Sequence, residues 1–302
     1  MNIVTQNDLA THENVAPPQA QRSNFSYSFK LLPKEERSAI NSVYAFCSYI
    51  DDIVDGTPNI NSKSVVRKLD RLSWWEQEIE RLYEGKNDSY YLRPFYALIK
   101  RFDIPKQYFL TLIDGVRTDL VKYRYRTFDE LKDYCYSVAS IVGLISIEIF
   151  GYKYEETKSY AINLGYALQL TNILRDIKFD AHRGYIYLPA EDLTKFNYTE
   201  AELMASVYND NFIELMRYET GRAREYFHRA RTYLRPDEKP TIIAAEIMDA
   251  IYFRLLEKIE LNNFNVFHKK IKVSTSHKIL LSAKHWLSMK MFIQRFLSGK
   301  DK

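Results

Sequence analysis

The sequence predicts an all-α protein, and three observations lead to that class. Glycine and proline number nine each among 302 residues, and a mostly β chain or a Rossmann-type chain needs more residues that form turns and loops. Apolar residues make up 46% and charged residues 27%, which is typical of a globular chain long enough to bury a sizeable core. Long stretches also follow the i, i+3, i+4, i+7 apolar spacing of amphipathic helices.

The expected helices follow one another with short breaks rich in Gly, Pro or Asn. Their predicted ranges are 34–55, 62–83, 94–101, 105–120, 128–150, 155–179, 199–206, 211–234, 241–261 and 277–296. A short extended segment, Tyr185–Leu188, is framed by Gly184 and Pro189. Because no composition shift marks a linker and no repeat is found, we expect a flexible arm over 1–22 and a single all-α domain over 23–302.

The cysteines and the apolar runs indicate the cellular compartment in which the protein is expected. Cys47 and Cys135 lie in apolar helical stretches and form neither a disulfide framework nor a metal-ligand spacing. No run approaches the roughly 18 apolar residues of a membrane span, and residues 1–21 lack an apolar signal core. The expected location is the cytoplasm.

Positive charge is concentrated at the C-terminal end. Residues 266–302 contain nine Lys or Arg and one acid, although the whole chain has a net charge of only +4. Two interpretations stay open: a helix in peripheral contact with the anionic inner membrane surface, or a core helix with a solvated basic face. Nucleic acid is not an expected partner, because no recognition motif accompanies the basic segment.

Two predicted helices break their own apolar pattern with oxygen-bearing side chains. In the first, the inward stripe consists of Ile40, Val43, Tyr44 and Cys47. The same stripe then meets Asp51 and Asp55, with Asp52 beside them. Acids at the end of an inward face carry a desolvation cost unless a cation compensates it.

The second helix repeats this arrangement. Its inward stripe runs through Ala161, Gly165 and Leu168, and four-residue steps then give Asn172, Asp176 and Asp180, with Gln169 and Arg175 alongside. Two facing helices with such oxygen ligands can hold Mg²⁺, which usually binds one or two carboxylates together with substrate phosphate oxygens. The pattern therefore predicts a magnesium site completed by a diphosphate.

Other interpretations of the acids are less favoured. Either cluster alone is typical of a solvated helix end, but two clusters that each continue an apolar stripe favour a site. An EF-hand is excluded because Ile53 and Ser62 stand where oxygen ligands are needed. A di-iron bundle is excluded because the six histidines form no Glu-x-x-His pairs.

Six segments then carry a family resemblance. They are SNFSYSFKLLP (23–33), YAFCSYIDDIVD (44–55), DGVRTD (114–119), YCYSVASIVG (134–143), LQLTNILRD (168–176) and RGYIYLP (183–189). In order and spacing, over roughly residues 23–278, the chain resembles the squalene/phytoene synthase family of head-to-head prenyl synthases. Within that family it is most similar to the bacterial presqualene diphosphate and squalene-type members.

The resemblance implies an isoprenoid synthase helical fold around a central apolar cavity, with site residues carried over by position. The implied catalytic residues are Asp51, Asp52, Asp55, Tyr44, Tyr134, Asn172 and Asp176. The implied metal ligands are Asp51, Asp55, Asn172, Asp176 and Asp180. The implied substrate-binding residues are Arg175, Gln169, Val138, Ala139, Gly143, Tyr252, Lys270 and Lys278.

The implied reaction is an Mg²⁺-dependent condensation of two farnesyl diphosphates to presqualene diphosphate or a squalene-type C30 product, with release of diphosphate. Two or three Mg²⁺ ions would accompany the substrate. Two alternatives stay open: phytoene synthesis from geranylgeranyl diphosphate, and a non-catalytic binding or assembly protein. NADPH is permitted by the family but not expected, since the chain lacks a glycine-rich dinucleotide loop.

The chain departs from the common family pattern at four positions. Ser48 stands where the first aspartate motif usually has Arg, and Asn24 replaces a usual Ser or Thr. Phe179 replaces the usual acid before Asp180, and Tyr185 replaces a usual Arg. None of these changes removes an implied metal ligand, so catalysis is still expected.

Overall fold

The computed structural model describes residues 28–55, 62–86 and 92–298; the predicted arm over 1–22 and the Asn24 position lie outside these residues. The helices are α3 (Lys34–Asp55), α4 (Ser62–Tyr83), α5 (Arg93–Phe102), α6 (Lys106–Thr118), α7 (Phe128–Cys135), the π-helical segment η2 (Tyr136–Ser140), α8 (Ile141–Phe150), α9 (Glu156–His182), α10 (Ala190–Lys195), α11 (Glu200–Met204), α12 (Asp210–Tyr233), α13 (Ile243–Leu261) and α14 (Thr275–Ser298).

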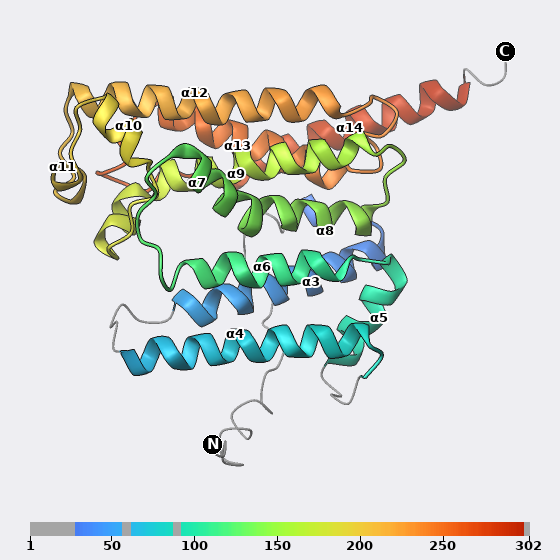
Figure 1. The fold of residues 1–302 in the computed structure, drawn as a ribbon. Coiled ribbons are helices and arrows are strands. Elements are labelled where there is room, and N and C mark those ends of the chain that lie inside the picture. Colours follow the sequence, from blue (N-terminus) through green and yellow to red (C-terminus); the bar gives the residue numbers. More distant parts are fainter. Residues whose placement is uncertain (1–27, 56–61, 87–91, 299–302) are drawn as a thin grey trace, which may run out of the picture.

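The predicted all-α class is confirmed. No β-strand occurs in residues 28–55, 62–86 and 92–298, and the segment expected to be extended contributes one isolated parallel bridge, between Arg124 and Ile186. In Figure 1 the long helices run side by side across the view, with α12 along one edge of the bundle and α4 along the other. Helix α9 packs against α8, η2, α12 and α13, and it is therefore the central element of the bundle.

Two glycines let helices approach η2 closely. A Cβ at Gly165 of α9 would lie 2.4 Å from Ser140 Cα, and a Cβ at Gly115 of α6 would lie 2.6 Å from Ser137 Cβ. The Ser140 hydroxyl donates a hydrogen bond of 2.8 Å to the carbonyl oxygen of Ile162 on α9. The π-helical turn is thus held between α6 and α9, and π-turns of this kind are frequent at functional sites.

The start of α9 is fixed by a buried acid. Glu238 is completely buried, and its carboxylate accepts hydrogen bonds from the backbone N–H of Lys153 at 2.6 Å and from the Thr157 hydroxyl. An acid at a helix N-terminus satisfies otherwise unpaired N–H groups and complements the helix dipole. This contact ties α9, the helix with the second oxygen cluster, to the segment before α13.

One stretch, Phe128–Phe150, is long and apolar enough to cross a membrane by length and composition. No such run was expected from the sequence. More than half of its most apolar window, 56%, is buried, and its segments pack against α6 and α9. A central helix of a helical bundle has the same composition, and this packing places the stretch in the core.

Candidate active site

The two oxygen-bearing helix faces meet at one polar opening, which we call the mouth. It has a volume of about 280 Å³. Its acidic and amide residues are Asp51 from α3, Asp119 after α6, and Gln169, Asn172, Asp176 and Asp180 from α9. Arg183 and Lys270 add positive charge to the same opening. The structure thus brings four of the five predicted metal ligands together; the side chain of Asp55, the fifth, lies outside the described part.

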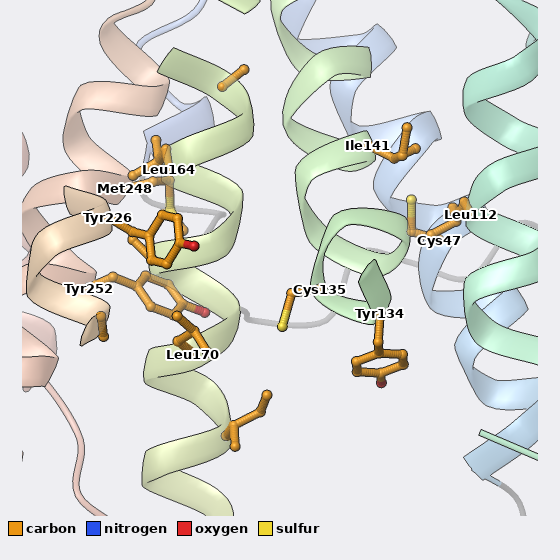
Figure 2. Close-up of a cluster of buried hydrophobic side chains, with 14 of the residues drawn as sticks. Cys47, Leu112, Tyr134, Cys135, Ile141, Leu164, Leu170, Tyr226, Met248 and Tyr252 are labelled. Atoms are coloured by element: carbon orange, nitrogen blue, oxygen red, sulfur yellow. The ribbon is translucent and has the colours of Figure 1, made fainter. Parts of the chain in front are cut away.

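An apolar cavity of about 340 Å³ continues from the mouth into the bundle. The two spaces share Asp51, Val138, Gln169 and Asn172 in their walls. Figure 2 shows Leu164 and Met248 on one side of this cavity and Cys47 and Leu112 on the other side. A polar mouth above an apolar cavity is suited to a molecule with a charged head and a long hydrocarbon chain.

Asp176, in the wall of the mouth, is bound to two cations, of which Lys270 also lines the mouth and Arg175 does not. Its carboxylate accepts hydrogen bonds from Arg175 Nε at 3.0 Å and from a terminal nitrogen of Arg175, and Lys270 Nζ lies 2.9 Å from Asp176 Oδ1. Burial favours the neutral acid, but these two cations outweigh burial and lower the pKa of Asp176. Asp176 is therefore a charged carboxylate, and Lys270 is positioned in the mouth, where an anionic headgroup would bind.

Asp180 lies one helical turn further along and has the opposite electrostatic environment. Burial, together with the nearby carboxylate of Asp176, raises the pKa of Asp180 to about 7. Arg183 opposes this shift without cancelling it. A buried carboxyl that is costly to ionise gains most from a bound cation.

The residues of the mouth fit a hard divalent cation. Asn172 Oδ1 is buried and accepts no hydrogen bond within the described part of the chain, so an oxygen ligand is left without a donor. The other candidate ligands are carboxylates, the type that Mg²⁺ prefers. Within the described ranges no three Asp, Glu, His or Cys side chains are close enough to form a metal site by themselves. Oxygens of a bound diphosphate would have to complete the coordination.

Two tyrosine hydroxyls converge on Asp119 at the edge of the mouth. Tyr134 Oη donates to Asp119 Oδ2 at 2.9 Å, and Tyr187 Oη donates to Asp119 Oδ1 at 3.1 Å. The two rings are stacked with centroids 5.4 Å apart. Burial, and then the Asp119 charge, raise the pKa of Tyr134 well above its usual value, so its hydroxyl stays protonated.

Asp119 was not predicted as a site residue. It closes the DGVRTD segment, but its tyrosine contacts depend on a chain reversal that no local spacing reveals. The departure at Tyr185 has a role in the same group, because the Tyr185 hydroxyl donates to the backbone oxygen of Asp119 at 2.8 Å.

Other predicted site residues lie away from the mouth. Ala139, Gly143 and Tyr44 line the apolar cavity, as does Ser48, one of the departures. Tyr252 is buried on α13 against Arg175. Asp52 is exposed beside Asp51 and is not part of either wall, and Lys278 lies on α14 outside both walls. The roles assigned to all these residues stay predictions.

Phe179, another departure, is 57% exposed at the rim of the mouth. The guanidinium carbon of Arg183 lies 5.4 Å from the centre of its ring, and Lys270 Nζ lies 5.9 Å from it. Where the family commonly has an acid, this chain thus has an aromatic face in contact with two cations.

Fold and site together define an isoprenoid synthase fold: an all-α bundle with an acidic mouth over an apolar cavity. The family model for squalene/phytoene synthase matches residues 19–277. The chain therefore belongs to the squalene/phytoene synthase family, whose members are head-to-head prenyl synthases, a class of prenyltransferases that use diphosphate substrates with a divalent metal.

Relatives and solved structures agree with this assignment. A phytoene synthase of Arthrospira platensis is 36% identical over 272 residues, covering 85% of each chain. A 15-cis-phytoene synthase of Synechococcus elongatus is 35% identical over 82% of this chain and 83% of its own.

The squalene synthase HpnC from Alicyclobacillus acidocaldarius superposes with a TM-score of 0.75 at 26% identity, covering 86% of this chain and 95% of its own. A dehydrosqualene synthase bound to a ligand also superposes with a TM-score of 0.75 at 26% identity, covering 95% of this chain and 98% of its own.

Proposed function

We propose that the protein joins two molecules of geranylgeranyl diphosphate head to head into a C40 phytoene-type hydrocarbon. The observation that carries this proposal is the similarity to phytoene synthases, at 35–36% identity over more than four-fifths of the chain. The farnesyl reaction, which the sequence resemblance placed first, becomes the second candidate.

The depth of the cavity can be compared with the lengths of the two prenyl chains. Asn172 at the mouth and Tyr160 in the cavity wall lie on the same helix, twelve residues apart. At 1.5 Å per residue, this separation is about 18 Å. An extended prenyl chain gains roughly 5 Å per isoprene unit from ordinary bond lengths, so a C15 chain needs about 15 Å and a C20 chain about 20 Å. The span of about 18 Å lies between these two lengths, so the choice of the longer chain rests on the similarity to phytoene synthases.

The chain's own residues account for binding and orientation of the substrate. Arg175 and Lys270, which contact Asp176, would hold diphosphate oxygens, while Val138 and Leu164, which line the cavity, would contact the hydrocarbon. Asp51, Asn172, Asp176 and Asp180 would hold Mg²⁺, which when bound supplies positive charge to the departing diphosphate.

The reaction balances without a reductant. Cleavage of the C–O bond of one substrate releases diphosphate and leaves an allylic cation. The double bond of the second substrate attacks this cation, and loss of a proton closes a cyclopropane ring. Loss of the second diphosphate, rearrangement and loss of another proton give the hydrocarbon. NADPH is therefore not part of the proposal.

The cations formed along this route must be kept from water, and the cavity wall serves that purpose. It is built from buried apolar residues such as Leu112, Ile147 and Met248. The aromatic rings of Phe29 and Tyr44, whose centroids lie 4.9 Å apart, also line it and can stabilise positive charge.

The second candidate is the C30 reaction with farnesyl diphosphate. It is supported by the superposition on a squalene synthase and a dehydrosqualene synthase. The proposed compartment for either reaction is the cytoplasm, which the two free and buried thiols, Cys47 and Cys135, support.

A comparison of the two substrates tests the proposal. With Mg²⁺, kcat/KM for geranylgeranyl diphosphate should exceed that for farnesyl diphosphate by at least tenfold, with a C40 product identified by mass spectrometry. A preference for farnesyl diphosphate would establish the C30 reaction instead. Binding of both substrates without any product would favour the non-catalytic alternative.

A further inference from the structure

The exposed side of α14 carries an apolar stripe. Leu280, Leu287 and Met291 are 64%, 53% and 56% exposed, and Ala283 is exposed between them. Steps of three, four and four residues place these four side chains on one face of the helix. Ile279, at the edge of this face, is 55% exposed. Soluble helices normally turn such a stripe inward, and a contiguous exposed stripe marks an interaction surface.

The opposite side of α14 is already occupied by the protein. Leu281 and Met289 pack against the hydrophobic core, and α14 contacts α13. The stripe therefore lies on the solvent-facing side of α14, opposite the side that packs against the core. In Figure 1 the C-terminal part of α14 projects beyond the rest of the bundle.

The charges beside the stripe indicate which kind of partner it can bind. Lys284 and Lys290 are exposed on either flank of the apolar residues, and Lys290 Nζ lies 4.0 Å from the centre of the Trp286 ring. The sequence of α14 contains four Lys or Arg residues and no Asp or Glu. Apolar residues flanked by lysines are complementary to an anionic bilayer. Symmetric pairing with a second α14 would instead bring like charges together.

A groove lies beside this surface, next along the chain to a residue of the substrate cavity. Ile279, Ala283 and Trp286 of α14 form its wall with Lys30 and Leu31. The adjacent residue, Phe29, lines the apolar cavity from the inside. Successive residues, Phe29 and then Lys30 and Leu31, thus line the cavity and the groove beside the stripe.

We propose that α14 docks the protein on an anionic lipid bilayer through the stripe Leu280, Ala283, Leu287 and Met291, with Lys284 and Lys290 contacting lipid phosphates. If the proposed function holds, the groove beside Phe29 is the route by which a water-insoluble hydrocarbon passes into the bilayer. Docking itself does not depend on which prenyl substrate is used.

The test is co-sedimentation of the full chain with vesicles of phosphatidylcholine alone or of phosphatidylcholine and phosphatidylglycerol in equal parts. Binding is expected only to the anionic vesicles and should weaken with added salt. The double variant Lys284→Gln/Lys290→Gln should lower the partition coefficient roughly thirtyfold. Leu280→Gln/Leu287→Gln should lower it at least tenfold, because the buried apolar area is lost.

Matched controls use equally exposed residues elsewhere. Leu261 is 73% exposed at the end of α13. Lys86 is exposed just after α4 and Lys100 is exposed in α5, and both of these helices lie away from α14 in Figure 1. Leu261→Gln and Lys86→Gln/Lys100→Gln should leave vesicle binding unchanged. Loss of binding in these controls, or wild-type binding that is indifferent to anionic lipid, would overturn the proposal.

Three further outcomes are decisive. If sedimentation equilibrium without lipid shows a dimer that Leu280→Gln/Leu287→Gln abolishes, the stripe pairs two copies and the lipid proposal is wrong. Steady-state turnover should rise with anionic vesicles for the wild type but not for Lys284→Gln/Lys290→Gln. Vesicle binding without any prenyl product would contradict the proposed function and leave docking intact.

Discussion

The carboxylate of Asp119 holds the hydroxyl of Tyr134 at 2.9 Å, at the edge of the mouth where the two oxygen-bearing helix faces meet. Its second oxygen accepts from Tyr187 at 3.1 Å, so both carboxylate oxygens are engaged by tyrosines. Asp119 is thus a positioning residue for Tyr134, whose ring faces the same opening as Asn172 and Asp180.

Asp119→Asn should lower kcat by about tenfold to a hundredfold with little change in KM, since a buried charged hydrogen bond contributes on the order of 1.5–3 kcal/mol. In a Tyr134→Phe background, Asp119→Asn should lower kcat only slightly further, because the two residues act as a unit. Tyr185→Phe is the matched control, since its hydroxyl donates to the backbone oxygen of Asp119 and not to the carboxylate. Additive losses in the double variant would contradict the positioning role.

The sequence predicted the helices closely because their boundaries depend on local signals. The range 62–83 is the same in prediction and structure, and the others agree to within a few residues. Helix α10 (Ala190–Lys195) was missed because it is short and has no side-chain N-cap, whereas the equally short α11 begins with a Thr199–Glu202 capping box. The π-turn η2 was missed because it depends on the close approach of Gly115 and Gly165 from other helices.

The candidate site was predictable to the extent that it lies on helix faces. Asp51, Asn172, Asp176 and Asp180 were expected together from four-residue spacing, and they share one opening. The pairing of Asp119 with Tyr187 spans 68 residues, so no local pattern reveals it. The exposed apolar stripe of α14 could not be predicted either, because the sequence does not say which side of that helix the core covers.

Gly165→Ala should destabilise the fold by about 1–3 kcal/mol, because the new Cβ would lie 2.4 Å from Ser140 Cα. Gly221, in the middle of α12, has no neighbouring atom within 4 Å of the place where a Cβ would stand. Gly221→Ala should therefore leave stability unchanged or raise it by up to about 1 kcal/mol through helix propensity. Urea unfolding of both variants checks the prediction, and equal effects would show that α9 and η2 are not in tight contact.

Leu164→Trp should reduce the usable depth of the cavity. Leu164 is 5% exposed and faces the cavity from α9 (Figure 2). We expect kcat/KM for geranylgeranyl diphosphate to fall at least tenfold more than that for farnesyl diphosphate, since the longer chain reaches further past this residue. Leu164→Met conserves volume and should leave the ratio unchanged. An equal loss for both substrates would argue against a chain that extends along α9.

A buried acid pair predicts how stability depends on pH. Glu219 is 2% exposed, accepts hydrogen bonds from Arg222 at 2.7 and 2.8 Å, and lies near Asp192, to which Arg222 also donates at 2.8 Å. Burial outweighs the Arg222 charge and raises the pKa of Glu219 to about 8. The folded pKa exceeds the unfolded value of about 4.3, so this stabilisation is complete below that value and is lost as the pH rises towards 8.

Calorimetry at pH 6 and pH 8.5 tests the predicted loss of stability with rising pH. The wild type should lose more stability over this interval than Glu219→Gln, which keeps a neutral side chain at both values. The matched control is Glu214→Gln on the same helix, since Glu214 is exposed and paired with Arg217. A wild type that gains stability between the two pH values relative to Glu219→Gln would contradict the raised pKa.

The most direct test of the central claim is the product and stoichiometry of one reaction. The purified full chain is incubated with geranylgeranyl diphosphate and Mg²⁺, without NADPH, and hydrocarbon and released diphosphate are quantified together. Our account predicts one C40 hydrocarbon for every two diphosphates released, with the reaction abolished by a chelator and lowered at least a hundredfold by Asn172→Ala. Release of diphosphate without a C40 hydrocarbon, or substrate binding with no diphosphate released, would contradict it.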